Sequence, residues 1–367
     1  MHEGARVEAS GPMSATLPAT LPLTLLTGFL GSGKTSFLRR ALSDRAFADT
    51  AVVVNEIGEI AIDHHLVDFV EGDVVELPGG CLCCAMREDL ARTLRGLIDR
   101  RDGGALRPFR RIVVETTGLA DPAPILFTLG ADPMLDYRLR LARVVTIVDA
   151  STGAETLGRF PEAARQAALA DVLVISKTDL APAALELAPR LDELNPRAHR
   201  FLGAVAEPGE VLFGGAFGAR SLAWPRVGEA GIGGDPANIA EGDHAAHSHG
   251  IDVFAIALSG PITRLQFAHT LGALAQARGN DLLRVKGIVC FADRPEGPAV
   301  VQAAQHALFA PEWLDDWPDE DRRNRLVFIV HDISREEILS RFAFAEGRPL
   351  GGSTATAAAS IQRAVSE

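Results

Sequence analysis

The stretch Gly28-Phe-Leu-Gly-Ser-Gly-Lys-Thr35 constrains the chain most, because it fits the phosphate-loop pattern G-x-x-x-x-G-K-[ST] at every position. The apolar run Leu21–Leu26 before it predicts a buried strand, and the segment Lys34–Leu42 after it predicts a helix. Such a loop wraps a phosphate with main-chain amides at a helix N-terminus. Lys34 would reach the β- and γ-phosphates, and the Thr35 hydroxyl would bind magnesium. The expected nucleotide-binding residues of this loop are Gly28, Gly31, Ser32, Gly33, Lys34, Thr35 and Ser36.

Composition excludes several classes of protein. The chain has 367 residues, 47% of them hydrophobic, which is enough for two domains with real cores. A formal net charge of −12 argues against nucleic acid as a partner, and no apolar run is long enough to span a membrane. Residues 1–20 lack the basic start and apolar core of a signal peptide, so we expect a flexible tail and a cytoplasmic protein. Nothing in the sequence specifies an oligomeric state.

Lysine is rare in this chain. Of 36 basic residues only Lys34, Lys177 and Lys286 are lysines, and arginine serves everywhere else. A lysine ammonium is compact, whereas an arginine guanidinium is a wide planar fork. The three positions are therefore candidates for sites where the fork does not fit, and Lys34 already lies in the phosphate loop.

The pattern of strands and helices predicts a fold class. Apolar strands alternate with helical stretches up to about residue 205, which is typical of an α/β P-loop NTPase with a mostly parallel sheet covered on both faces. From residue 206 to 250 the pattern dissolves into Gly, Ala, Pro and Asp, and it then resumes as a smaller α+β domain. The expected strands are 21–26, 51–55, 74–77, 111–114, 144–148, 172–175, 252–258, 282–290, 300–307 and 326–330. The expected segments are a flexible tail (1–20), a P-loop GTPase domain (21–205), a linker (206–250), a C-terminal domain (251–346) and a second flexible tail (347–367).

Two further motifs follow strand ends, where ligands bind in open α/β sheets. Glu115 ends a hydrophobic strand, so its carboxylate can hold the magnesium shell, and the Gly118 amide can sense a γ-phosphate. Later, Ser176-Lys-Thr-Asp179 ends another strand. Asp179 can accept hydrogen bonds from the two nitrogen donors on the edge of guanine, and the Lys177 stem would lie along the base. These residues predict guanine rather than adenine.

A cysteine cluster adds metal chemistry to the nucleotide site. Cys81, Cys83 and Cys84 can offer three thiolates to one ion, and thiolates favour zinc. A tetrahedral site then needs a fourth ligand or a water, and an open position lets the ion be released. Redox chemistry and plain burial are the alternatives. Cys290 lies in a strand of the other domain and is expected in its core.

Acidic and histidine side chains between the phosphate loop and the cysteines predict a loop that closes over the nucleotide. In P-loop GTPases such loops order around the γ-phosphate and loosen after hydrolysis. If one of these residues also touched the metal, the nucleotide state would control metal affinity; a solvated loop is the alternative. The residues are Glu56, Glu59, Asp63, His64 and His65. The linker ends in three more candidate ligands, which either bind a divalent metal weakly or form only a polar linker: His244, His247 and His249.

Together these motifs resemble those of the CobW-type metal-associated GTPases, also described as zinc-regulated GTPase metalloprotein activators. The resemblance spans about residues 23–342. It rests on Gly28–Ser36, Asn55–Glu59 with Ile62-Asp63, Gly80-Cys-Leu-Cys-Cys84, Glu115-Thr-Thr-Gly-Leu-Ala-Asp-Pro122, the base motif at 176–179, and Arg284-Val-Lys-Gly287. It implies slow magnesium-dependent GTP hydrolysis coupled to delivery of a metal, often zinc, to client proteins. The C-x-C-C cysteines would hold the cargo, and the smaller domain would contact the GTPase domain and the client.

One position departs from the family pattern. The base motif usually begins with Asn, which ties the base loop to the phosphate loop, but here the residue is Ser176. The shorter side chain predicts weaker guanine affinity, with specificity kept by Asp179. No glutamine stands where Ras-like enzymes orient their attacking water, so hydrolysis should be slow without a partner.

The main hypothesis is therefore that the protein is a GTP-driven chaperone for zinc or cobalt, and two other hypotheses stay open. A P-loop kinase with a structural zinc would prefer ATP and phosphorylate a small molecule. A non-enzymatic metal buffer or adaptor would use GTP only for its shape. The thiolate set suits zinc and cobalt alike, and the sequence does not name the client.

Overall fold

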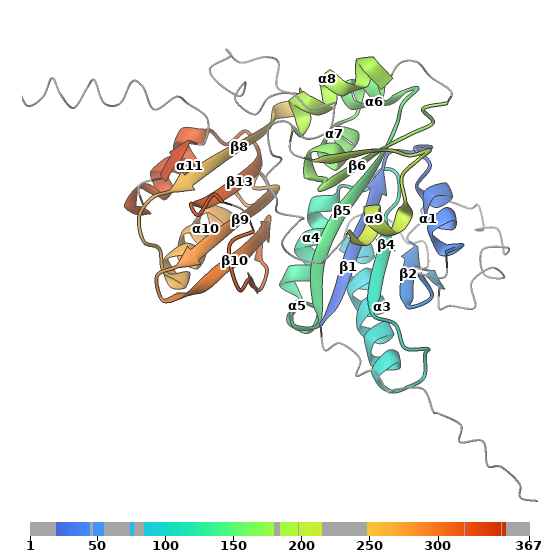
Figure 1. The fold of residues 1–367 in the computed structure, drawn as a ribbon, viewed down its shortest axis with the longest axis horizontal. Helices are drawn as coiled ribbons and strands as arrows, with labels where there is room; N and C mark the ends of the chain where they lie inside the picture. The colour runs from blue at the N-terminus through green and yellow to red at the C-terminus, as the bar shows by residue number, and fades with distance from the viewer. Residues whose placement is uncertain are drawn as a thin grey trace, which may run out of the picture.

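The computed structural model describes residues 20–44, 47–54, 74–76, 84–179, 184–196, 198–214, 248–318, 320–345 and 347–349. Within these ranges the chain forms two sheets, each with its own helices, lying side by side (Figure 1). Residues 21–202 build the first sheet, and residues 251–349 build the second. Among the helices described, none combines the length and the apolar character needed to cross a membrane.

The first sheet has seven strands, and every pairing in it is parallel. Its order is β3-β2-β4-β1-β5-β6-β7. The strands are β1 (Leu21–Gly28), β2 (Thr50–Val54), β3 (Val74–Glu76), β4 (Arg111–Glu115), β5 (Leu139–Asp149), β6 (Val172–Ser176) and β7 (His199–Leu202). Register places Leu26 beside Glu115, and Asp149 beside Ser176, so the carboxyl ends of the central strands meet at one edge. The α/β class expected from the sequence is confirmed.

Helices cover both faces of this sheet because each strand directs apolar side chains alternately to one face and to the other. On β1, Leu23 and Leu25 enter one core with α3 and α4, whereas Leu26 enters the opposite core with α1 and α9. The predicted apolar face of α3, with Leu90 and Leu94, is buried in the first of these cores. The helices are α1 (Lys34–Leu42), α3 (Cys84–Asp102), α4 (Pro122–Ala131), α5 (Pro133–Arg138), α6 (Gly153–Arg159), α7 (Pro161–Leu169), α8 (Ala184–Leu194) and α9 (Pro208–Phe213).

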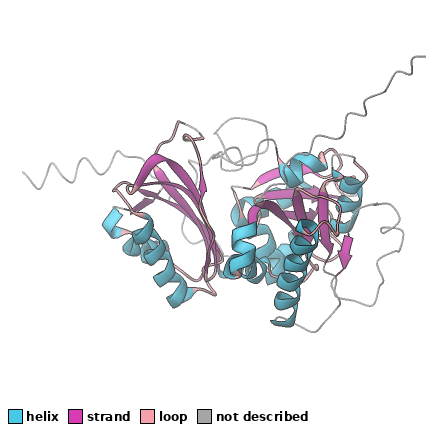
Figure 2. Ribbon diagram, turned by 90° about the horizontal axis from the view of Figure 1, so that it is seen from below, coloured by secondary structure: helices cyan, strands magenta, loops and turns pink. Residues whose placement is uncertain are grey.

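The second domain is a seven-stranded antiparallel sheet backed by helices on the face turned away from the first domain (Figure 2). Its strands run in the order β11-β10-β9-β13-β8-β14, with β12 paired to β10. They are β8 (Ile251–Leu258), β9 (Arg284–Phe291), β10 (Arg294–Ala304), β11 (Ala307–Leu308), β12 (Glu312–Trp313), β13 (Asn324–His331) and β14 (Gly347–Pro349). The helices are α10 (Arg264–Arg278) and α11 (Arg335–Arg341), with single 3-10 turns η4 (Ser248–Gly250) and η5 (Ala343–Ala345).

The other face of the second sheet packs on the first domain. Ile251, Leu283 and Ile329 share one apolar cluster with side chains of α6, α7 and α8. Two polar contacts also join the domains: Arg140 of β5 pairs with Glu312 at 2.5 Å, and Gln302 donates to the Leu141 carbonyl at 3.2 Å. The two domains therefore bury a common interface.

Several expected boundaries differ from the structure. Helix α9 forms inside the range expected as linker, because Val211, Leu212 and Phe213 fill the core beneath α1 despite their Gly-rich surroundings. The expected second tail begins with β14, which pairs with β8. The strand expected over 300–307 instead starts at Arg294 and turns back at Gln305, and Cys290 is half-buried rather than in the core.

Candidate nucleotide-binding site

The phosphate loop connects β1 to α1 in the geometry that its glycines allow. Gly28, Gly31 and Gly33 all have positive φ, at 144°, 70° and 95°. At Gly28 a Cβ would also collide with the Ile147 carbonyl on β5, so this position needs glycine for two reasons. Lys34 is 8% exposed, and its ammonium donates to the Gly28 carbonyl at 2.9 Å and to the Phe29 carbonyl at 3.3 Å. The Lys34 ammonium is therefore hydrogen-bonded to main-chain carbonyls of the phosphate loop itself.

The proposed magnesium ligands meet beneath this loop. The Thr35 hydroxyl, in the first turn of α1, donates to Glu115 Oε1 at 2.8 Å. Glu115 is 1% exposed and ends β4, the neighbour of β1. Magnesium prefers hard oxygen ligands, and a hydroxyl beside a buried carboxylate is a donor set that fits it. Ser36, the next residue of α1, is exposed.

Gly118 lies against the phosphate loop. A Cβ there would fall 2.7 Å from the Leu30 amide nitrogen, so any larger residue would push the two loops apart. The chain before it is fastened by the Thr116 amide, which donates to the Leu26 carbonyl at 2.9 Å, and by the Thr116 hydroxyl, which donates to that of Thr27 at 2.8 Å. The predicted γ-phosphate sensor is therefore in contact with the predicted phosphate cradle.

The base motif is tied to the phosphate loop by the residue that departs from the family pattern. Ser176, at the end of β6, donates its hydroxyl hydrogen to the Ser32 carbonyl at 2.6 Å, with the Val148 carbonyl 3.3 Å away. A serine therefore reaches far enough to make the tie. Its effect on guanine affinity stays a prediction. Asp179 follows three residues later and is exposed.

Lys177 forms an ion pair with Asp149, a residue for which the sequence predicted no role. Its ammonium lies 2.6 Å from Asp149 Oδ2, at the end of β5. Burial opposes the charged form of Asp149, but hydrogen bonds from Lys177 and from Ser151 outweigh it and lower the pKa of Asp149. The only signal in the sequence was that Asp149 ends a predicted strand, as Glu115 does.

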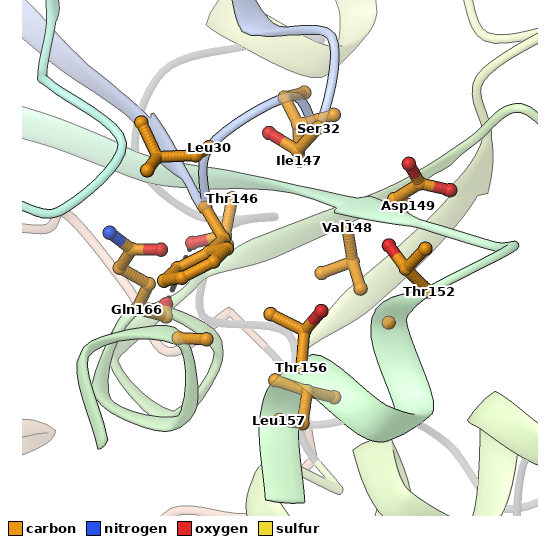
Figure 3. Close-up of a pocket in the computed structure, with 13 residues that line it drawn as sticks. Leu30, Ser32, Thr146, Ile147, Val148, Asp149, Thr152, Thr156, Leu157 and Gln166 are labelled. Carbon is orange, nitrogen blue, oxygen red and sulfur yellow. Dashed lines mark hydrogen bonds between the residues drawn. The ribbon is translucent and has the colours of Figure 1, made fainter. Parts of the chain in front are cut away.

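A small pocket of about 20 Å³ opens beside the phosphate loop (Figure 3). Leu30 and Ser32 line it on one side, and Thr156 and Gln166 of α6 and α7 line it on the other (Figure 3). This volume is large enough for a single water molecule and too small for a nucleotide. Gln166 is fully buried, and nothing in the sequence marked it.

Lys286, the third lysine, lies away from the nucleotide site. Its ammonium pairs with Asp171 Oδ1, while Arg284 pairs with Asp171 Oδ2 at 3.0 Å. Burial alone would raise the pKa of Asp171, but the charges of Arg284 and Lys286 hold it well below its usual range. Both cations come from β9, and Asp171 immediately precedes β6. Lys286 is therefore part of the contact between domains.

Most of the expected metal ligands lie outside the described residues: Cys81, Cys83, Glu56, Glu59, Asp63, His64, His65, His244 and His247. Cys84 begins α3, but its side chain is not among those described. His249 is described, and its Nε2 lies 3.2 Å from the Leu157 carbonyl of α6. Across the ranges that the structure describes, no three His, Cys, Asp or Glu side chains gather to hold a metal ion. The metal-site assignments stay predictions.

Both domains match known protein families. Residues 22–201 match the CobW/HypB/UreG nucleotide-binding domain, and residues 251–345 match the C-terminal domain of the cobalamin synthesis protein CobW. The chain is 31% identical to the zinc chaperone YjiA of Escherichia coli, over 88% of this chain and 98% of YjiA. It is 29% identical to the zinc chaperone CobW of Pseudomonas aeruginosa, over 92% of this chain and 94% of that protein. The crystal structure of Zn(II)-bound YjiA superposes with a TM-score of 0.62 at 27% identity, covering 89% of this chain and 99% of YjiA.

Proposed function

The chain belongs to the CobW/HypB/UreG family of nucleotide-binding proteins, and from that premise we propose that it is a GTP-dependent metallochaperone. It binds zinc, or cobalt, at Cys81, Cys83 and Cys84 and transfers the ion to a client protein that requires it. Slow hydrolysis of GTP accompanies the transfer. The observation that carries the proposal is the 2.8 Å contact between the Thr35 hydroxyl and Glu115 Oε1, because it joins the phosphate loop to a buried carboxylate at the place where a GTPase binds magnesium.

The residues around this contact have distinct roles in hydrolysis. Lys34 binds the β- and γ-phosphates, and the main-chain amides from Gly31 to Thr35 surround them. The Gly118 amide donates to the γ-phosphate. Magnesium held by Thr35 and Glu115 would supply neutralisation of the phosphate charge. None of these residues is a glutamine that could orient the attacking water, so the intrinsic rate is low.

Guanine selection rests on the base motif. Ser176 holds the base loop to the phosphate loop through the Ser32 carbonyl. Asp149 fixes Lys177, so that the lysine stem lies beside the base. Asp179, which is exposed at the end of the motif, accepts hydrogen bonds from the guanine edge.

The place of the cysteines in the topology supports coupling between metal and nucleotide. Strand β3 ends at Glu76, and α3 begins at Cys84. In a parallel sheet the helix that follows a strand starts at the strand's carboxyl end, which is also the edge that carries Glu115 and Ser176. Loops that respond to the γ-phosphate therefore lie near the start of α3, and hydrolysis can change the affinity for the thiolate-bound ion.

The test is a competition titration of the full chain with zinc and with cobalt, in the apo, GDP-bound and GTP-analogue-bound states, followed by GTP turnover with the metal bound. Metal affinity that differs between nucleotide states supports the proposal, and equal affinity in all three refutes the coupling. Two variants serve as controls. Lys34→Ala should abolish nucleotide binding, whereas Cys83→Ser combined with Cys84→Ser should remove tight metal binding and spare the nucleotide. Preference for ATP would favour a kinase, and absence of phosphate release in the presence of metal and client would favour a passive buffer.

A further inference from the structure

Gln166 occupies a position that the nucleotide site does not explain. It lies on α7, is fully buried, and sends its carboxamide toward the loop that follows β4. The amide nitrogen donates to the Gly118 carbonyl at 3.1 Å and to the Ala120 carbonyl at 2.9 Å. Both acceptors are carbonyls, so the NH₂ end of the side chain must face them. Its Oε1 accepts no hydrogen bond within the described part of the chain and turns to the pocket beside Leu30 (Figure 3).

The loop of residues 116–121, here called the Gly118 loop, is therefore in contact with other elements on two sides. The phosphate loop touches it at Leu30, and Gln166 holds its carbonyls from α7. A second contact from α7 strengthens the hold, since Arg165 pairs with Asp121 at 2.9 Å, and Asp121 caps the N-terminus of α4. The Gly118 carbonyl belongs to the same planar peptide unit as the Leu119 N–H, so fixing that carbonyl fixes the peptide unit that directly follows the Gly118 Cα. Gln166 thus holds the chain directly after the Gly118 amide and limits where that amide can lie.

The far end of α7 is held by the second domain. The Leu169 carbonyl accepts from Arg284, which also pairs with Asp171. Asn195 closes the same helix end by donating to the carbonyls of Ala167, Ala168 and Ala170. Between its two ends α7 is a short helix of small side chains, nearly all of them buried, so its ends move together.

We propose that Gln166 is a positioning residue that orients the Gly118 loop toward the γ-phosphate, and that α7 passes the position of this loop to Arg284 in the C-terminal domain. The inference rests on the proposed GTPase function. When Gly118 moves to contact a γ-phosphate, the hydrogen bond to its carbonyl moves Gln166, and α7 moves with Gln166. The contact of Leu169 and Asp171 with β9 then shifts. The C-terminal domain thereby distinguishes the GTP state from the GDP state.

The first experiment separates positioning from a merely structural role. Gln166→Met keeps the length of the side chain and removes both donors. In the full chain we expect affinity for a non-hydrolysable GTP analogue to fall about tenfold, GDP affinity to change less than about twofold, and kcat for phosphate release to fall by about tenfold or more. An equal fall in GDP and GTP-analogue affinity, or no fall in either, would overturn the positioning role.

A second variant keeps the result independent of folding defects. Gln166→Glu has no donor when ionised and one when protonated, so its kcat relative to that of the native chain should rise as the pH is lowered from 8 to 6. A ratio that stays flat or falls over this range counts against hydrogen-bond donation to Gly118 and Ala120.

The coupling to the second domain is measured by hydrogen exchange of β9 in the full chain. The native protein should exchange β9 amides at different rates with GDP and with the GTP analogue, and Gln166→Met should lose that difference. The matched control is Arg140→Gln, which breaks the pair with Glu312 in the same interface but does not touch α7, so the difference should persist. Identical exchange in both states of the native protein, or loss of the difference in Arg140→Gln, would overturn the coupling. Failure of the native chain to bind guanine nucleotides would instead refute the proposed function.

Discussion

At the scale of single residues, a side chain shorter than the one in the family pattern still ties the base motif to the phosphate loop. Ser176 stands where the family pattern has asparagine, yet its hydroxyl reaches the Ser32 carbonyl at 2.6 Å. The reach is sufficient because β6 ends at Ser176 itself, which places the hydroxyl beside the phosphate loop. Lys177, the next residue, takes a left-handed conformation with φ of 53°, which turns its side chain back to Asp149.

The tie made by Ser176 can be measured by removing its hydroxyl. Ser176→Ala leaves the Ser32 carbonyl without this donor, which costs about 1 kcal/mol, or about fivefold in affinity. GDP and GTP affinities should fall equally, because the tie supports the base and not the γ-phosphate. Fluorescent nucleotide titration measures both. A loss confined to GTP would contradict this role, and Ser43→Ala, at the exposed end of α1, is the control.

Loss of the Glu115 charge should weaken magnesium binding more than it weakens nucleotide binding. Glu115→Gln keeps the shape and an acceptor for Thr35 but removes the charge that attracts the cation. We expect apparent magnesium affinity in GTP turnover to weaken by about 10- to 100-fold, with nucleotide binding in the absence of magnesium retained. Magnesium titration of phosphate release gives the first quantity, and fluorescent nucleotide binding in chelator gives the second. Unchanged magnesium dependence would remove Glu115 from the metal site.

At the scale of helices and strands, the sequence predicted those elements whose determining residues are close together along the chain. The helix Lys34–Leu42 matches its prediction, since the glycine and lysine spacing and the apolar run before it are contiguous in the sequence. Asp149, Gln166 and Asp171 escaped assignment, because their partners lie 28, 48 and 113 residues away. Helix α9 and strand β14 escaped for the same reason: each is stabilised by a neighbour far along the chain.

The β9 strand gives a test of the lysine pattern. Lys286 shares Asp171 with Arg284, whose guanidinium already fills one side of the carboxylate and is nearly fully buried. Lys286→Arg adds a second fork where the space holds an ammonium, so we expect a loss of about 1–3 kcal/mol in the free energy of unfolding. Urea denaturation measures it, with Arg264→Lys in the exposed pair with Asp293 as the control. Native stability in Lys286→Arg would show that the position accepts either cation.

The same cluster predicts how stability depends on acid. The pKa of Asp171 is lowered in the folded chain, whereas the unfolded chain has the ordinary value of about 3.9. Between these values the unfolded state binds more protons, so this contribution is present above about pH 4 and is lost as the pH falls toward the folded pKa. Asp171→Asn should be less stable at pH 7 by about 3–5 kcal/mol, since two buried cations lose their counter-ion. It should also show a shallower fall in unfolding free energy below pH 4, and an unchanged slope would contradict this account.

At the scale of the whole molecule, the two domains share an apolar cluster in addition to the polar contacts between them. Leu283 and Ile329 of the second domain are nearly fully buried among side chains of α7 and α8. The covered face of the second sheet would be exposed to water if the first domain unfolded alone. The loss of that burial makes partial unfolding unfavourable, so the domains should unfold as one unit.

Tryptophan fluorescence can test this cooperativity. Trp313, which packs on Phe291 and Arg294, and Trp317, which lies beneath Arg325, both report on the second domain, whereas Trp224 lies outside the described residues and can be replaced by Phe. In a Trp224→Phe chain, the urea transition followed by fluorescence should coincide with that followed by far-UV circular dichroism, which both domains contribute to. Leu283→Ala should destabilise the chain by about 2–5 kcal/mol and separate the two transitions, because it removes a side chain from the shared cluster. Leu265→Ala, at an exposed position of α10, should leave them together. Separate transitions in the Trp224→Phe chain would mean that the interface contributes less than the stability of either domain.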